Sequence, residues 1–205
     1  LLRSPRLLDG VEHFIGPEVY SNPIQHVRIK VPERMVPLEN QDDMNSRTPW
    51  HQDASVVLEE AANTQMLTVW MAITEATEEN GCLVVVPGSH LPNELAVHCR
   101  IEGEKRLTGI PDEYVGPERL PVPMEPGDVL FMTKMTKHAS LTNESDGIRF
   151  SFDLRYNPTG QPTGRNWYPG FIARSKANPE SELKDFDQWD KAWEEAHQAL
   201  KAIDY

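Results

Sequence analysis

A histidine and an aspartate two positions apart are the first residues of this sequence that could do metal chemistry. They are His51 and Asp53, within Trp50-His51-Gln52-Asp53, and the chain has no other His-x-Asp pair. On an extended strand, residues i and i+2 point to the same side, so this imidazole and this carboxylate would face one point. Short motifs also arise by chance, and a surface histidine near an aspartate is the plain alternative. The pair therefore needs further residues to support it.

A second histidine offers a third ligand. Iron(II) that activates dioxygen is typically held by two imidazoles and one carboxylate on one face, which leaves positions open for other ligands. His138 follows the apolar run Val129–Met132, which reads as a strand. We therefore expect His51, Asp53 and His138 to form a candidate iron site.

An arginine and a serine follow the second histidine. Arg149 and Ser151 are again two residues apart, within Arg149-Phe150-Ser151. A guanidinium binds a planar carboxylate through two parallel hydrogen bonds, and a hydroxyl on the same face can add another. This pair suits the distal carboxylate of 2-oxoglutarate.

The elements that must position these residues read as strands. Seventeen prolines and twelve glycines punctuate short β-branched and aromatic runs, which is typical of an all-β sandwich or barrel. An Asn80-Gly81 turn further predicts an antiparallel hairpin between the second and third strands. The predicted strands are Gln25–Val31, Gln65–Ile73, Gly81–Val86, Asp128–Met132 and Ile148–Tyr156.

The last predicted strand has two chemically different faces. Arg149, Ser151, Asp153 and Arg155 alternate with apolar and aromatic residues. A solvent-exposed face explains this polar row. An internal ligand cavity explains it equally well, since small barrels and jelly rolls enclose sites lined by inward-pointing side chains.

Two further segments complete the chain. Residues 158–169 form a loop rich in glycine and proline, which could act as a lid and which carries Arg165 and Trp167. Residues 181–203 repeat apolar side chains at helical spacing and predict a C-terminal amphipathic helix packed on the outside of the sheets.

Taken together, these motifs give a resemblance to the phytanoyl-CoA dioxygenase family of Fe(II)/2-oxoglutarate oxygenases. The matches keep their order over roughly residues 25 to 160. They are Pro49-Trp50-His51-Gln52-Asp53-Ala54, Val69-Trp70-Met71-Ala72, Asn80-Gly81-Cys82-Leu83, Pro87-Gly88-Ser89-His90, Gly127-Asp128-Val129-Leu130-Phe131, His138 and Arg149.

The resemblance implies a double-stranded β-helix, a jelly-roll and cupin-like fold that is mainly β with flanking helices. It implies that His51, Asp53 and His138 bind the metal and carry catalysis, and that Arg149 anchors 2-oxoglutarate. Trp70 and Ser140 occupy positions that lie against the cosubstrate in relatives.

The implied activity is oxidation of a small organic molecule by iron(II), 2-oxoglutarate and dioxygen, with release of succinate and CO₂. Hydroxylation, desaturation and rearrangement stay open. Since Asp53 is present, halogenation is disfavoured. The rival interpretations are a cupin-like isomerase or a dioxygenase without a cosubstrate, and a non-catalytic metal- or ligand-binding sensor.

Bulk properties set the remaining expectations. With 205 residues, the chain is predicted to be a single domain. Its net charge of −12 disfavours nucleic acid and anionic membranes as partners. The sequence has no membrane-spanning run and no signal-peptide pattern, and Cys82 and Cys99 are too few for a disulfide framework, so a cytoplasmic protein is expected. The chain begins at Leu1 rather than at a methionine, so a truncated N-terminal part is expected.

Several residues keep two interpretations. Lys30 could reach a carboxylate in the cavity or be a solvated edge lysine, and Gln65 is a weaker candidate of the same kind. Arg165 and Trp167 could meet the substrate or simply clamp an exposed loop. His90 reads as a turn residue, and His98 as structural or on the surface.

Overall fold

The computed structural model describes residues 1–37, 47–101 and 108–202, and the chain divides into two compact units. The first unit comprises Leu1–Gln25, Val57–Leu67 and Leu154–Tyr205. The second comprises His26–Val56 and Thr68–Asp153. A single domain over residues 1–205 stays a prediction. Within the described residues, no helix is long and apolar enough to cross a membrane.

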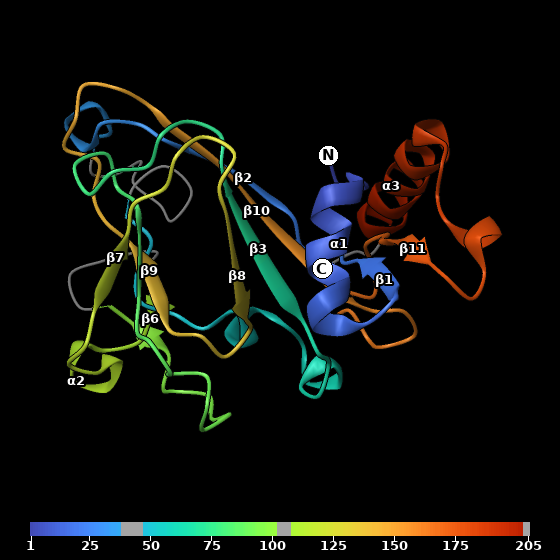
Figure 1. Cartoon of the computed structure of the whole chain (residues 1–205), viewed down its shortest axis with the longest axis horizontal. Coiled ribbons are helices and arrows are strands. Elements are labelled where there is room, and N and C mark those ends of the chain that lie inside the picture. The colour runs from blue at the N-terminus through green and yellow to red at the C-terminus, as the bar shows by residue number, and fades with distance from the viewer. Residues whose placement is uncertain (38–46, 102–107, 203–205) are drawn as a thin grey trace. The chain divides into compact units, whose positions relative to one another are not determined.

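The first unit combines helices with a small antiparallel group of strands (Figure 1). Strand β1 (Glu18–Ser21) pairs with β11 (Phe171–Ser175) and with the last residues of β10 (Arg149–Pro158). The helical elements of this unit are α1 (Pro5–Ile15), η4 (Glu59–Ala61), η5 (Pro179–Ser181) and α3 (Phe186–Lys201).

Helix α1 was not predicted, although its sequence carries the signals. Pro5 stands at the start, where its missing N–H costs nothing. Leu7, Leu8, Val11 and Ile15 are buried at helical spacing. Each such side chain stabilises the fold by about 1.5–3 kcal/mol when it leaves water, so burial of one face holds this short helix in place.

Helix α3 confirms the predicted C-terminal helix. Asp185 caps it by accepting a hydrogen bond from the Asp187 amide at 3.0 Å. The prediction began too early, because residues 179–181 form the separate turn η5, and its last residue, Ile203, lies outside the described residues. Aromatic contacts attach the helix, with Trp193 stacked on Tyr168 at 5.3 Å between ring centroids.

The second unit contains two main sheets (Figure 1). In the larger one, the first residues of β10 lie between β2 (His26–Lys30) and β3 (Leu67–Ala72), and β3 in turn pairs with β8 (Val129–Thr133). In the smaller one, β4 (Leu83–Val85) lies between β7 (Leu120–Val122) and β9 (His138–Ser140). The remaining elements are the strand pair β5 (Cys99–Arg100) and β6 (Thr108–Gly109), the turns η1 (Glu33–Met35) and η3 (Asp53–Val56), and α2 (Asp112–Val115).

All five predicted strands are present as β2, β3, β4, β8 and β10, but the predicted hairpin between β3 and β4 is wrong. The turn itself forms, since Gly81 has a φ of +89° and the Asn80 side chain accepts from the Thr77 amide. Before this turn, however, Ala76 bridges to Met124, outside the larger sheet. The turn therefore directs the chain into the smaller sheet, where β4 pairs with β7 and β9.

The polar row of β10 faces inward. Within the second unit, Arg149, Ser151 and Asp153 are all buried. On β2, Arg28 and Lys30 are buried too, while Val27 and Ile29 are about half exposed at 51% and 49%. The polar side chains of both strands therefore point into the protein and the apolar ones point outward, the reverse of an ordinary half-buried sheet. This finding favours the internal cavity over the solvent face.

Candidate metal centre

The structure brings the three predicted ligands together. One ligand atom from each of His51, Asp53 and His138 lies within 4.8 Å of the others. The two histidines form an isolated antiparallel bridge, in which the His51 amide donates to the His138 carbonyl at 2.9 Å and the His138 amide returns the bond at 3.0 Å. Two segments far apart in the sequence are thus fixed side by side by their backbones.

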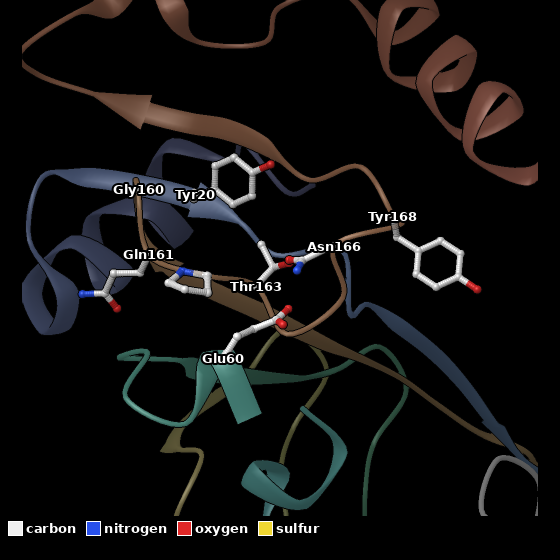
Figure 2. A pocket seen from close by; sticks show the side chains of 8 residues that line it. Tyr20, Glu60, Gly160, Gln161, Thr163, Asn166 and Tyr168 are labelled. Carbon is white, nitrogen blue, oxygen red and sulfur yellow. The ribbon is translucent and has the colours of Figure 1, made fainter. Parts of the chain in front are cut away.

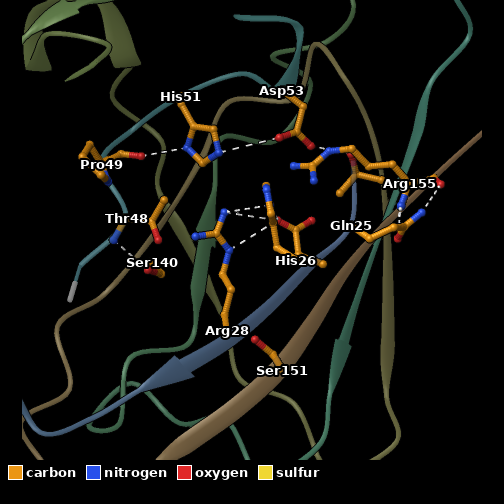
Figure 3. Close-up of polar contacts among 12 residues, drawn as sticks. Gln25, His26, Arg28, Thr48, Pro49, His51, Asp53, Ser140, Ser151 and Arg155 are labelled. Carbon is orange, nitrogen blue, oxygen red and sulfur yellow. Dashed lines mark hydrogen bonds and ion pairs between the residues drawn. The ribbon is translucent and has the colours of Figure 1, made fainter. Parts of the chain in front are cut away.

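Both imidazoles are oriented by backbone carbonyls. His51 Nδ1–H donates to the Pro49 carbonyl at 2.8 Å, as Figure 3 shows, and His138 Nδ1–H donates to the Thr136 carbonyl at 2.9 Å. Since a carbonyl can only accept, these bonds fix the proton on Nδ1 and leave the lone pair on Nε2. Burial, and then the neighbouring His138, lower the pKa of His51 to about 3. His51 therefore stays neutral, the form that binds a metal ion.

Asp53 opens η3 and is held by a threonine. Its Oδ1 lies 3.8 Å from His51 Nε2, and its Oδ2 accepts a short hydrogen bond from the Thr68 hydroxyl on β3. Both Asp53 and Thr68 are buried. The threonine thus occupies one carboxylate oxygen and leaves the other facing the histidines. No sequence signal identified Thr68, since its partner is 15 residues away in the chain.

Gln52, between two of the ligands, fixes the loop that carries them. Its buried side chain donates to the carbonyls of Glu94 and Met135 and accepts from the Ala96 amide, at 2.7–3.0 Å. Its own amide donates to His98 Nε2 at 3.1 Å. His98 is therefore structural, as one of its two interpretations stated, because it accepts a hydrogen bond from the residue between two of the metal ligands.

A buried guanidinium lies on the neighbouring strand. Arg149 is 1% exposed, donates from Nη1 to Ser151 Oγ at 2.6 Å and lies over the Trp70 ring at 5.2 Å. Its Nε has no hydrogen-bond partner, and no carboxylate in the described part of the chain pairs with it. Burial, followed by the charge of Arg28, lowers its pKa to about 10. Such a cation is costly unless an anion compensates it.

Lys30 lies opposite Arg149 in the pairing of β2 with β10. Its ammonium donates to Ser140 Oγ and to the Leu141 carbonyl, both at 2.5 Å and both neutral. Burial and the charge of Arg149 lower its pKa to about 6. Lys30 is 2% exposed, so the interpretation as a solvated edge lysine is wrong, while its contact with a carboxylate in the cavity stays a prediction.

These residues surround one cavity between the two sheets. Five of the site residues proposed from the sequence line it, together with five residues that were not proposed as site residues. The first group is His51, Trp70, His138, Ser140 and Arg149, and the second is Arg28, Thr48, Leu83, Ala139 and Asp153. Asp53 and Ser151 are not part of the lining. The space left inside is about 10 Å³.

The other sequence candidates lie in the first unit. Gln65 is exposed, and its amide bonds to the Gln161 side chain at 2.7 Å. Trp167 is 54% exposed, and the Arg165 side chain bonds to the adjacent Gly164 carbonyl. Whether these residues contact a cosubstrate or substrate, and whether loop 158–169 is a lid, stay predictions.

That loop lines a second pocket of about 530 Å³ (Figure 2). Hydrogen bonds from Asn22 to the Thr163 carbonyl and from Thr64 to the Pro162 carbonyl hold the loop in place. Glu60 is the only charged side chain in the lining. The pocket therefore lacks the set of ligands that a metal ion requires, and the metal centre belongs to the second unit.

The family model described as phytanoyl-CoA dioxygenase (PhyH) matches residues 1–151. The chain belongs to this family. A probable phytanoyl-CoA dioxygenase of Caenorhabditis elegans is 36% identical over 119 residues, which are 55% of this chain and 37% of that protein. The 1-deoxypentalenic acid 11-beta-hydroxylase of Streptomyces arenae is 35% identical over 130 residues, 58% of this chain and 44% of that protein. The chain thus spans less than half the length of these two relatives.

A solved structure has a similar fold. The epimerase SnoN in complex with Fe³⁺, alpha-ketoglutarate and nogalamycin RO is 25% identical, with a TM-score of 0.56. The match covers 80% of this chain and 60% of that one. Together with the two antiparallel sheets, it confirms the predicted jelly-roll, cupin-like fold.

Proposed function

We propose that this protein is an iron(II)- and 2-oxoglutarate-dependent oxygenase that hydroxylates a small organic molecule. One observation carries the proposal: the buried and unpaired Arg149 lines the same cavity as His51 and His138. A metal site alone would suit many enzymes. A metal site beside an uncompensated guanidinium suits a ligand that chelates a metal at one end and carries a carboxylate at the other, as 2-oxoglutarate does.

The ligand set fits iron(II). Two neutral imidazoles and one carboxylate on one side of an ion leave further positions for a cosubstrate and dioxygen. When bound, iron(II) and 2-oxoglutarate supply the oxidising power, since dioxygen is reduced while 2-oxoglutarate is converted to succinate and CO₂. His51, Asp53 and His138 hold the metal ion in this proposal.

Arg149 and Lys30 receive the distal carboxylate. Two hydroxyls complete that site, because each already accepts a hydrogen bond from a cation: Ser151 from Arg149 and Ser140 from Lys30. A hydroxyl that accepts in this way keeps its own proton to donate. Both serines can therefore donate to the same carboxylate, while Trp70 beside the guanidinium helps to exclude water.

The test is formation of succinate. Purified protein loaded with iron(II) is supplied with 2-oxoglutarate and dioxygen, and succinate is measured with and without extracts of small metabolites. We expect turnover in the wild type, and we expect it to be lost in His51→Ala and Arg149→Ala. If the wild type binds iron normally yet never forms succinate, the oxygenase assignment is wrong and a sensor or isomerase on the same fold replaces it.

Epimerisation is the second candidate, because the solved structure of SnoN is that of an epimerase. The two reactions differ in the mass of the product. Hydroxylation adds about 16 mass units to the substrate, whereas epimerisation adds none. Mass spectrometry of the oxidised metabolite distinguishes them, and a loss of about 2 mass units would indicate desaturation instead.

A further inference from the structure

A third cation faces the cavity, and the cosubstrate does not account for it. Arg28 precedes Lys30 by two residues on the inward face of β2 and is 8% exposed. It lines the cavity together with His51 and His138. Figure 3 shows its side chain extending toward the side where His51 lies. Arg28 is therefore close to the metal centre.

Asp153 orients this guanidinium. Arg28 Nε and Nη2 lie 3.4 and 3.3 Å from Asp153 Oδ2. Both contacts are long for charge-assisted hydrogen bonds, and both use one carboxylate oxygen. A guanidinium carries five N–H donors, so a second carboxylate can share it with Asp153. The aspartate then aims the arginine into the cavity.

The charges of the cavity leave room for one more anion. In the second unit, the lining and the metal ligands include the cations Arg28 and Arg149 and the carboxylates Asp53 and Asp153. Lys30 joins this set through its hydrogen bond to Ser140 Oγ in the lining. A divalent metal ion and the dianionic cosubstrate cancel each other. With Lys30 charged beside that cosubstrate, these named groups carry a net charge of about +1. A monoanion completes the balance, and buried charges require such compensation.

We propose that Arg28 binds a carboxylate of the primary substrate, so that this oxygenase acts on small organic acids. The inference rests on the proposed function, because it assigns Lys30 and Arg149 to the cosubstrate. Residues two apart on a strand are about 7 Å apart. Arg28 thus lies one repeat along β2 from Lys30, and the two carboxylates are bound at separate positions.

The test compares an acid with its neutral amide. Protein loaded with iron(II) and saturating 2-oxoglutarate, without oxygen, is titrated with 4,4,4-trifluorobutanoate or 4,4,4-trifluorobutanamide and followed by fluorine NMR. We expect the wild type to bind the acid about tenfold or more tightly than the amide, as for a lost charged hydrogen bond. Arg28→Leu should lose this preference. Arg34→Leu should keep it, since Arg34 is an exposed arginine paired with Asp146.

A second variant guards against misfolding. Arg28→Leu leaves Asp153 buried beside an apolar side chain, whereas the double variant Arg28→Leu/Asp153→Leu removes both charges together. It too should bind acid and amide equally. In both variants the affinity for 2-oxoglutarate, followed by the absorbance of its iron complex, should change less than about threefold.

Three results would overturn the assignment of Arg28. They are equal binding of acid and amide by the wild type, a preference that survives in both variants, and displacement of the acid by additional 2-oxoglutarate. A loss of 2-oxoglutarate binding in the Arg28 variants would make Arg28 a cosubstrate residue instead. If the wild type itself fails to bind 2-oxoglutarate, the proposed function falls, and the substrate class falls with it.

Discussion

The two ends of the cavity differ in how far the chain itself satisfies them. At the metal end, comprising His51, Asp53 and His138, each side chain has a partner that orients it: a carbonyl for each imidazole and the Thr68 hydroxyl for the carboxylate. At the cation end, comprising Lys30 and Arg149, the hydrogen-bond partners are neutral and no carboxylate among the described residues forms an ion pair with either cation.

The metal end is thus preorganised for its ligand, whereas the cation end needs a bound anion to balance its charge. The metal end is built in advance, since hydrogen bonds to the other atoms of the ligands fix their geometry. The cation end is left electrostatically unfavourable, and its lowered pKa values record that cost. A site of the second kind gains most when an anion arrives. The comparison therefore predicts opposite effects of mutations at the two ends.

The largest effect is expected at the metal end. Asp53→Ala removes the only carboxylate of the triad and should weaken iron(II) binding by more than about a hundredfold. This loss exceeds the roughly 10- to 100-fold loss that is typical when a residue that only orients a metal ligand is removed. Succinate formation should fall below detection. Anaerobic titration calorimetry measures the affinity, with Asp190→Ala on the exposed face of α3 as the control. Full iron affinity in Asp53→Ala would show that the triad is wrong.

At the cation end, binding and stability should change in opposite directions. Arg149→Met removes an uncompensated buried charge, so the ligand-free protein should become more stable by about 1–3 kcal/mol. The affinity for 2-oxoglutarate should fall about a hundredfold, with iron affinity unchanged. Urea unfolding and cosubstrate titration measure the two effects.

The matched control for that variant is Arg34→Met, which removes an arginine on the surface. It should change stability by less than about 0.5 kcal/mol. A strongly destabilised Arg149→Met protein would mean that the guanidinium stabilises the fold, and the cation end would then not be incomplete.

The sequence was more informative about the metal end than about the cation end. His-x-Asp is a local pattern, and the second histidine follows a recognisable strand, so this end could be predicted. Arg149 and Ser151 were visible for the same reason. The inward position of Lys30 and Arg28 could not be settled, because alternation in β2 shows two faces but not which one is buried.

The supporting residues were invisible for a different reason. Thr68 and His98 act through partners 15 and 46 residues away in the sequence, and only the fold brings them together. The prediction of a hairpin between β3 and β4 was wrong for the same reason. An Asn-Gly turn specifies only a local reversal of the chain, whereas pairing with β7 and β9 decides the sheet to which β4 belongs. Helix α1 was overlooked although its local signals were present.

The cation end should also respond to pH. Because folding lowers the pKa of Lys30 from 10.5 to about 6, the unfolded chain holds a proton that the folded chain lacks between these values. The stability of the ligand-free protein should therefore rise with pH across this window. A bound dianion favours charged Lys30, so 2-oxoglutarate binding should take up close to one proton above pH 6.

The affinity of the protein for 2-oxoglutarate should then fall by up to about tenfold for each pH unit above 6, until the pKa of Lys30 in the complex is reached. Calorimetry in buffers of different ionisation enthalpy measures the proton uptake at a single pH. Lys30→Met should abolish it. Proton uptake that persists in Lys30→Met would assign it to another group and would weaken the description of this end as incomplete.

The smallest effect is expected where preorganisation alone is changed. Thr68→Val keeps the shape of the side chain but removes the hydroxyl that binds Asp53 Oδ2, so the carboxylate loses one of the contacts that orient it. Iron(II) affinity should fall about tenfold, and Thr68→Ser, which keeps the hydroxyl, should restore most of it. Since Thr68 acts only through Asp53, Thr68→Val should have no further effect in an Asp53→Ala background. An additional loss in the double variant would mean that Thr68 supports the cavity in some way other than by holding this ligand.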